Sequence, residues 1–402
     1  MAKAAINADI AASAPAEDRA AAAARFRRLT LTDFRSYAKA DIALDGRPVV
    51  FAGPNGAGKT NILEAISLIG PGRGLRSARL EELPRVEGTG AWAVAARFEA
   101  AGDERKFGVG AAADAPDRRQ CRIDEGAVAG PSAFSDLVRF SWLTPAQDRL
   151  FMDAPGERRR FLDRMSLAHD PAHGRAGADY ELAMRQRQKL LDEKSRDDAW
   201  LAALEAQMAE TGVAVAASRR ETAGALAAAD IAGADDGLFP AADIALEGEL
   251  ETGLAYAPAA DVEEAFAARL KANRRADAEA GRALAGPHRS DLLVTHREKG
   301  RHARLCSTGE QKALLIGLVL AHARALSLAA RFRREKAPLV LLLDEIAAHL
   351  DADRRAGLFD ILDGLGFQVF MTGTDKSLFA AWGGRAQGFA VDAGTITETD
   401  IG

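Results

Sequence analysis

The sequence predicts an α/β fold in which a sheet-forming head is split by a mainly α-helical insertion. Short apolar runs typical of strands occur before about residue 150 and again after about residue 280. The stretch between them is rich in Ala, Leu, Glu, Arg and Gln at helical spacing. We therefore expect a head formed by residues 25–150 and 280–402, with an insertion domain over residues 151–279.

The strands of the head follow from two kinds of pattern. Four early segments are short runs with the composition or alternation of strands, and two late segments are continuous apolar runs of the kind found in central parallel strands. The predicted strands are Leu29–Leu31, Ile42–Leu44, Trp92–Phe98, Phe107–Gly110, Leu339–Leu343 and Phe367–Met371. The apolar strand before the P-loop, Pro48–Ala52, and the late strands must share one sheet, so the head is split in sequence by the insertion.

The insertion is expected to contain long helices over Tyr180–Glu193 and Trp200–Arg220. A Gly- and Asp-containing segment, Asp230–Pro258, interrupts the helical pattern. No sustained heptad repeat is present, so we do not expect a long coiled coil. Strand character returns at Leu292–Thr295.

Bulk composition limits the location and the partners of the chain. The first 24 residues are Ala-rich and lack the basic start and apolar core of a signal peptide, so we expect a disordered tail. Two cysteines suggest the reducing cytoplasm, and no stretch approaches the roughly 20 apolar residues of a membrane span. The net charge of −5 means that DNA binding would need local basic clusters, for example Arg158–Arg160 or the group Arg73, Arg76 and Arg79.

The most specific motif is G-P-N-G-A-G-K-T, which matches the phosphate-binding P-loop pattern G-x-x-x-x-G-K-[ST]. Its residues are Gly53, Pro54, Asn55, Gly56, Ala57, Gly58, Lys59 and Thr60. An apolar strand precedes the loop and a helix follows it, so backbone N–H groups and a helix N-terminus converge on one point. We expect Lys59 to reach the β- and γ-phosphates of ATP and Thr60 to bind Mg²⁺.

Two acids directly follow the predicted Leu339–Leu343 strand. We assign Asp344 to the Mg²⁺ site and Glu345 to the general base that orients the attacking water. Together with Lys59 they form the predicted catalytic set.

A second phosphate-binding motif is suggested by the segment Cys306–Glu310. Ser307 and Glu310 have the S-x-x-E spacing of a capping box at the start of a helix. Alternatively, Gly309 leaves the helix N-terminus open to a phosphate, to which Ser307 would donate a hydrogen bond. This segment alone does not decide between the two interpretations.

Taken together, these segments resemble the ATP-binding-cassette (ABC) superfamily, whose signature reads L-S-G-G-[QE]. The resemblance implies an ABC-type ATPase head with a mixed sheet. It also implies that Ser307, Gly309 and Glu310 of one subunit complete the ATP site of another. Transport-type cassettes carry a histidine in the loop that corresponds to Thr372–Asp375, where this chain has none. Thr374 is the candidate substitute.

The spacing of the motifs separates classes within this superfamily. Lys59 and Ser307 lie 248 positions apart (307 − 59), which is too far for a compact transporter cassette. The insertion is also too short to form the paired long arms of chromosome-condensing ATPases.

The chain resembles the RecF family over most of residues 25–400. The resemblance rests on the segments Leu31–Tyr37, Gly53–Thr60, Arg158–Asp163, Tyr180–Leu191, Gly286–Asp291 and Ser307–Lys312. Departures are the Ala-rich tail and Glu345, where many relatives carry a second aspartate.

The resemblance implies a slow, ATP-dependent homodimeric ATPase of the cytoplasm. It would bind single-stranded or gapped DNA in gap repair and the SOS response, together with RecR and RecO. It also implies that Arg35 lies near the adenine or the phosphates, that Gln147 senses Mg²⁺, and that Arg289 supports nucleotide or arm contacts. The alternatives are a transport-coupled ATPase, a structural DNA clamp, and an ATPase–nuclease fusion, which would need a further acidic metal cluster.

Overall fold

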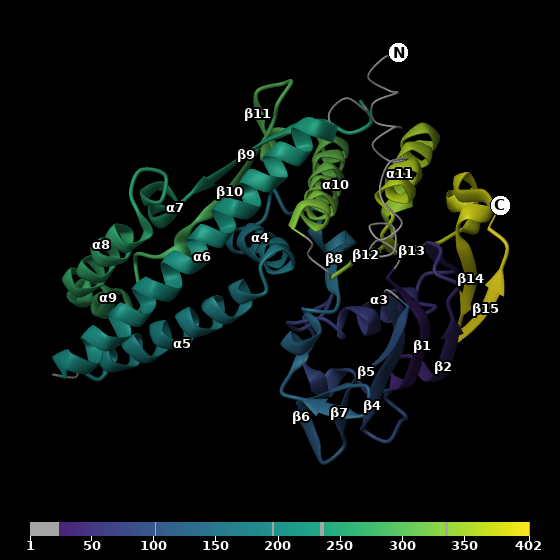
Figure 1. Ribbon diagram of the computed structural model, residues 1–402, viewed down its shortest axis with the longest axis horizontal. Helices are drawn as coiled ribbons and strands as arrows, with labels where there is room; N and C mark the ends of the chain where they lie inside the picture. Colours follow the sequence, from purple (N-terminus) through teal and green to yellow (C-terminus); the bar gives the residue numbers. More distant parts are fainter. Residues whose placement is uncertain (1–23, 101, 195–196, 234–236, 334–336, 402) are drawn as a thin grey trace. The chain divides into compact units, whose positions relative to one another are not determined.

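The computed structural model describes residues 24–100, 102–194, 197–233, 237–333 and 337–401 (Figure 1). The chain divides into two compact units, which we call the head unit (Met1–Pro145 and Leu326–Gly402) and the arm unit (Ala146–Ala325). The predicted tail lies outside the described residues except for Ala24, which is buried in the head core.

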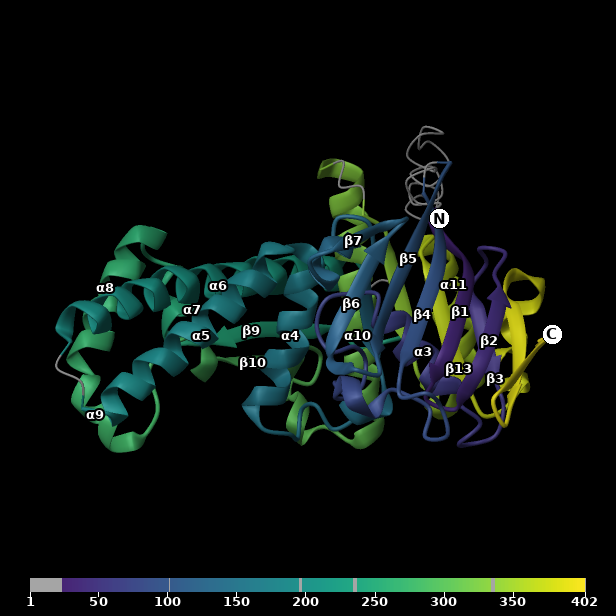
Figure 2. The same ribbon diagram turned by 90° about the horizontal axis from the view of Figure 1, so that it is seen from below.

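The first sheet of the head unit is antiparallel and has the order β2-β1-β4-β5-β6-β7 (Figure 2). Its strands are β1 (Arg25–Phe34), β2 (Tyr37–Ala43), β4 (Trp92–Ala100), β5 (Asp103–Ala112), β6 (Ala115–Ile123) and β7 (Gly126–Val128). Buried and exposed side chains alternate along β4, so one face of this sheet packs on the core. The four early strands expected from the sequence coincide with parts of β1, β2, β4 and β5, except that Leu44 lies one residue beyond β2.

The second head sheet is mixed, with the order β15-β14-β3-β13-β12-β8. Its strands are β3 (Val49–Ala52), β8 (Arg139–Leu143), β12 (Leu339–Leu343), β13 (Gln368–Gly373), β14 (Gln387–Asp392) and β15 (Thr395–Thr399). All neighbouring pairs are parallel except β14 and β15. The strand before the P-loop therefore shares a sheet with the late apolar strands, as the sequence predicts.

One hydrophobic core joins both head sheets through α3 (Lys59–Ser67). Ile62 and Ile66 of α3 pack in the same cluster as Phe26 of the first sheet and Phe51 of the second. Elsewhere in the head, Phe359 of α11 (Ala352–Leu365) stacks on Trp382, 5.0 Å away between ring centroids. The apolar face of α3 thus fixes the P-loop, which precedes it, against a rigid scaffold.

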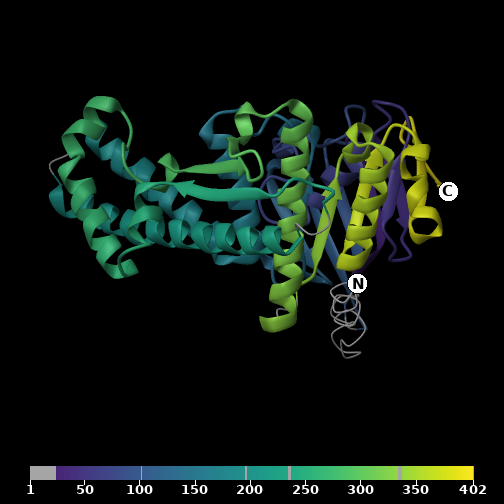
Figure 3. The same ribbon diagram turned by 90° about the horizontal axis from the view of Figure 1, so that it is seen from above.

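The arm unit combines helices with a three-stranded sheet of order β11-β10-β9. Its helices are α4 (Pro155–His169), α5 (Ala172–Asp192), α6 (Asp198–Gly233), α7 (Glu249–Gly253), α8 (Ala259–Ala272) and α9 (Arg274–Ala280), and its strands are β9 (Ala242–Glu247), β10 (Asp291–His296) and β11 (Arg301–His302). Figure 3 shows β9 and β10 side by side near α6. Tyr180, Met208 and Phe266 lie in its core.

The arm unit extends to Ala325, whereas the sequence predicts an insertion that ends at residue 279. The difference arises because the predicted strand Leu292–Thr295 belongs to β10, which pairs with β9 of the arm and not with a head sheet. The first part of α10 (Thr308–Arg333) also belongs to the arm, where His322 Nε2 lies 3.3 Å from the carbonyl oxygen of Met165.

The described residues contain one helix that is long and apolar enough to cross a membrane. It is Thr308–Ala329 of α10, with a mean hydropathy of 1.5, so the expectation that no stretch is this apolar is wrong. However, 72% of the tested window is buried in the structure. A buried core helix of a soluble protein has the same composition, so α10 is weak evidence for a membrane span.

Candidate nucleotide-binding site

The P-loop connects the end of β3 to the start of α3, and its glycines are required at specific points. Gly56 and Gly58 have φ values of 82° and 108°, in the region that favours glycine. A Cβ atom on Gly58 would lie 2.7 Å from Ser36 Oγ and 2.8 Å from the hydroxyl oxygen of Tyr37. Tyr37 in turn donates a hydrogen bond to the Gly58 carbonyl at 3.0 Å. The first sheet therefore holds the loop in shape.

Lys59 is almost completely buried beneath this loop. Its ammonium donates to the carbonyl oxygens of Gly53 at 2.7 Å and Pro54 at 3.0 Å, and it lies 3.4 Å from Glu345 Oε1. These partners hold the cation at the loop, where the phosphates of a nucleotide would meet it.

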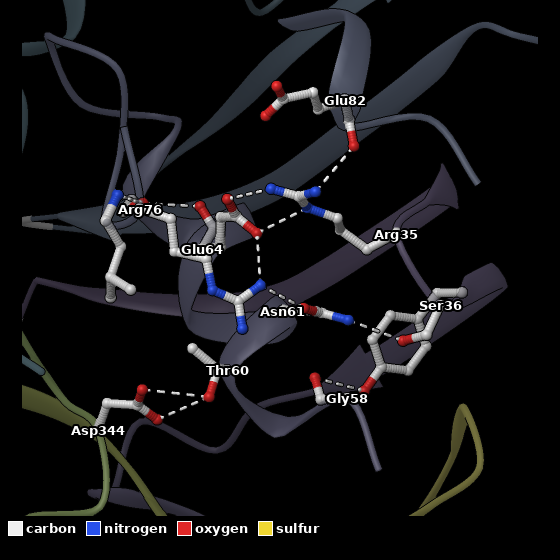
Figure 4. Close-up of polar contacts among 12 residues, drawn as sticks. Arg35, Ser36, Gly58, Thr60, Asn61, Glu64, Arg76, Glu82 and Asp344 are labelled. Atoms are coloured by element: carbon white, nitrogen blue, oxygen red, sulfur yellow. Dashed lines mark hydrogen bonds and ion pairs between the residues drawn. The ribbon is translucent and has the colours of Figure 1, made fainter. Parts of the chain in front are cut away.

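Thr60 and Asp344 meet across 284 positions of sequence. The Thr60 hydroxyl lies 2.9 Å from Oδ1 and 3.1 Å from Oδ2 of Asp344 (Figure 4). A hydroxyl and a carboxylate are hard oxygen ligands, which Mg²⁺ prefers. Among the described residues, no three His, Cys, Asp or Glu side chains gather as a metal cluster. These two residues therefore fit a magnesium site that phosphate oxygens and water complete.

Thr372, at the end of β13, contacts both acids of the pair and was not expected from the sequence. Its buried hydroxyl donates to Asp344 Oδ1 at 2.6 Å and accepts the backbone N–H of Glu345 at 3.0 Å. Thr374, our candidate in this loop, is exposed. The sequence signal that points to Thr372 is its position: it is a polar residue at the end of β13, and β13 is the neighbour of the strand that Asp344 follows.

Glu345 adopts the left-handed conformation, with a φ of 54°, which is uncommon for a residue with a side chain. The Thr372 contact to its N–H fixes this turn. Its carboxylate is partly exposed and faces Lys59. Strained backbone of this kind concentrates at functional sites, where the surrounding structure maintains it.

A cavity of about 260 Å³ joins these groups. Residues of the P-loop, Asp344 and Glu345 line it, together with Asn61, Arg76 and Pro145. Arg76 donates to Asn61 Oδ1 at 2.7 Å and lies 3.2 Å from Glu64 Oε2. The sequence places Arg76 only in a basic cluster, because its position at the cavity depends on folding of the segment after α3.

Arg35 does not line this cavity. It forms a two-pronged ion pair with the buried Glu64, with distances of 2.9 and 2.8 Å, and donates to the Glu82 carbonyl (Figure 4). Glu64 also contacts Arg76, so Arg35 is connected to the cavity through this carboxylate. A direct contact of Arg35 with a nucleotide stays a prediction.

Gln147 lies at the end of a 3₁₀ turn, Pro145–Gln147, that follows β8. Pro145 lines the cavity, while Gln147 belongs to the arm unit and its carbonyl accepts the N–H of Leu150. Its role toward Mg²⁺ stays a prediction.

Ser307 and Glu310 form the capping box that their spacing predicts. Glu310 Oε2 accepts hydrogen bonds from the N–H of Ser307 at 2.8 Å and from the hydroxyl of Ser307 at 2.9 Å. Lys299 forms an ion pair with the same carboxylate. Lys299 and the Ser307 groups lower the pKa of Glu310 to about 2. No atom approaches the position of a Cβ on Gly309, so this helix start is open. The capping box is present, and an open N-terminus is compatible with a phosphate.

Comparison with known proteins identifies the family. A family model described as RecF/RecN/SMC N terminal domain matches residues 25–395. A protein of Mesorhizobium japonicum named DNA replication and repair protein RecF is 51% identical over 374 residues, which cover 93% of this chain and 97% of the relative. The chain belongs to the RecF family. RecF of Brucella suis biovar 1 is 49% identical over 92% of this chain and 95% of its own length.

Solved structures confirm the expected ABC-type ATPase fold. The recombination mediator protein RecF with ATP, of the RecFOR pathway, superposes with a TM-score of 0.79, 21% identity and coverage of 94% of this chain and 98% of that chain. An Smc head domain derived from Pyrococcus furiosus gives a TM-score of 0.50 at 17% identity, over 94% and 97% of the two chains. RecF and SMC heads therefore share this mixed α/β architecture.

Proposed function

We propose that this RecF-family protein is a slow, ATP-dependent DNA-binding ATPase that acts as a recombination mediator in DNA repair and replication. The observation that carries the proposal is the contact of Thr60 with Asp344 beside Lys59 and Glu345. Residues from both ends of the head meet here, and together they supply phosphate binding, metal binding and a carboxylate base.

Each residue has a distinct task in hydrolysis. The P-loop N–H groups and Lys59 bind and orient the phosphates of ATP. Thr60 and Asp344 would hold Mg²⁺, which neutralises charge on the phosphate oxygens. Glu345 orients a water molecule and accepts its proton as the water attacks the γ-phosphate. Thr372 keeps both acids in place.

We propose further that ATP promotes a homodimer. In this arrangement Ser307 and Gly309 of one protomer meet the γ-phosphate bound by Lys59 of the other. A ligand at about 100 times its dissociation constant contributes about 2.7 kcal/mol per site by linkage. Two such sites shift the dimer equilibrium by several powers of ten, and hydrolysis would reverse the shift.

The partners follow from the relatives. Proteins named DNA replication and repair protein RecF and structures from the RecFOR pathway support DNA, RecR and RecO as partners. We propose single-stranded or gapped DNA as the target in gap repair and the SOS response, in the cytoplasm.

The central test is ATPase activity with and without gapped DNA, for the wild type and Lys59→Met. We expect stimulation by DNA that disappears in the variant. A wild type without ATPase activity would contradict the assignment. Ser307→Arg tests the dimer separately, because it should retain ATP binding and lose ATP-induced dimers in light scattering. Dimers that persist in this variant would exclude the shared site.

A further inference from the structure

The three arginines Arg158–Arg160 of α4 have different environments in the structure. Arg158 forms a two-pronged ion pair with Asp291, with both distances at 2.7 Å. Arg160 is 73% exposed and pairs with Glu157 on its own helix. Arg159 is half-buried, and its Nη1 donates to the carbonyl oxygen of Ser290 at 2.6 Å. The run is therefore not a uniform solvated face.

Arginines from two helices bind the segment Gly286–Asp291, which leads into β10. Arg158 and Arg159 of α4 bind its last two residues, and Arg219 of α6 donates to the Pro287 carbonyl at 2.6 Å. This segment carries Arg289, whose side chain is exposed. Hydrogen bonds from Arg159 and Arg219 thus hold the backbone on both sides of Arg289.

The negative charges of this region are already used by other cations. Asp291 is bound by Arg158, and Asp163 accepts two hydrogen bonds from Arg219 at 2.7 and 2.9 Å. Among the described residues, neither Arg159 nor Arg289 forms an ion pair. Two guanidinium groups in one small region are therefore left without a carboxylate partner.

Burial and the neighbouring charges both act on Arg159. Burial is the main cause that lowers the pKa of Arg159, and the positive charges of Arg219 and Arg289 lower it further, while Asp291 and Asp163 raise it in part. A cation in such a place gains from an anion that approaches it, because the anion relieves the repulsion. Guanidinium groups match phosphate oxygens in geometry and in charge.

We propose that Arg159 and Arg289 form a contact site for the phosphate backbone of DNA on the arm unit. The inference rests on the proposed DNA-binding function and adds a location to it. Arg289 supplies the exposed charge, and Arg159 positions the Ser290 backbone and adds a second charge. A contact of this kind reads phosphate, not base sequence, so it should act equally on any DNA sequence.

The test is the affinity of Arg289→Gln for gapped DNA as a function of salt. Because Arg289 is exposed and makes no ion pair, the variant should fold and unfold like the wild type. We expect about tenfold weaker binding at low salt and a salt slope reduced in magnitude by about one. Arg289→Lys should restore most of the slope. The affinity for ATP should not change.

The matched control is Arg185→Gln, which removes the same charge from an exposed arginine of α5 that pairs with Glu181. This control should bind DNA like the wild type. An unchanged salt slope in Arg289→Gln would overturn the site, and so would an equal loss in both variants, because that would reflect net charge alone. A wild type that does not bind DNA would instead contradict the proposed function.

Discussion

Thr372 and Asp344 share a hydrogen bond of 2.6 Å at the ends of the neighbouring parallel strands β13 and β12. The same hydroxyl accepts the N–H of Glu345, so one side chain fixes both acids of the site. A threonine that ends one strand thus supports the chemistry carried by the next. Thr372 is a positioning residue, because it acts through Asp344 and Glu345.

Thr372→Val should lower kcat for ATP hydrolysis by about tenfold, which corresponds to the loss of about one buried hydrogen bond to a charged group. The Mg²⁺ concentration that gives half-maximal activity should rise, because Asp344 loses its orientation. ATP binding without Mg²⁺ should change little, since Lys59 and the P-loop remain. Steady-state kinetics at varied Mg²⁺ measure these effects.

Two further variants test this role. Thr372→Ser keeps the hydroxyl and should retain most activity, whereas Thr397→Val changes an exposed threonine of β15 and should have no effect. If Thr372→Val lowers thermal stability but leaves kcat and the Mg²⁺ dependence unchanged, the hydroxyl is structural only.

Arg76→Gln should raise the KM for ATP several-fold, because Arg76 lines the cavity and its positive charge would attract the phosphates. It also leaves Glu64 with Arg35 as its remaining ion-pair partner, so little loss of stability is expected. Arg73→Gln is the control, since Arg73 is exposed and does not line the cavity. Equal KM values for the two variants would exclude a specific role of Arg76.

Arg187→Met should destabilise the arm by about 3–5 kcal/mol, because it leaves the buried Asp277 carboxylate without its cationic partner, while Glu205 keeps Arg274. Arg187 is 1% exposed and contacts Glu205 at 3.0 Å and Asp277 at 2.7 Å. Urea unfolding of the wild type, of Arg187→Met and of the surface control Arg185→Gln measures the loss of unfolding free energy. A change below about 1 kcal/mol would mean that the carboxylates find other partners or become protonated.

The pH dependence of the Ser307–Glu310 cap follows from the low pKa of Glu310. The folded pKa is about 2, below the ordinary value of 4.5. The carboxylate therefore stabilises the folded protein above the ordinary pKa, and this contribution is lost as pH falls from 4.5 toward 2. The stability difference between wild type and Glu310→Gln should be constant from about pH 7 to 5 and shrink below that. Urea unfolding at several pH values tests this, and a difference that grows on acidification would contradict it.

The sequence predicts the centre of the site well because each motif follows a buried strand. Lys59 and Asp344 follow β3 and β12, and parallel strands of one sheet bring their carboxyl ends to one edge. Arg76 and Thr372 were missed because their contacts depend on how an irregular segment and a neighbouring strand fold. The sequence does not predict the end of the arm, because β9, which pairs with β10, lies in a Gly- and Asp-containing segment that indicates only a break in the helical pattern. Such non-local pairing has no local signal.

Gly58→Ala should disrupt the P-loop more than Gly56→Ala, although both glycines have positive φ. At Gly58 the added methyl would lie 2.7 Å from Ser36 Oγ and close to the ring of Tyr37, whereas at Gly56 it would meet no atom within 4 Å. Both variants carry a backbone cost of about 1 kcal/mol or more. Only Gly58→Ala also has to move the buried Tyr37, whose hydroxyl binds the Gly58 carbonyl. We therefore expect Gly58→Ala to lower both Tm and ATP affinity, and Gly56→Ala to keep a Tm nearer the wild type. Equal Tm losses in the two variants would show that backbone strain, and not contact with the first sheet, sets the shape of the loop.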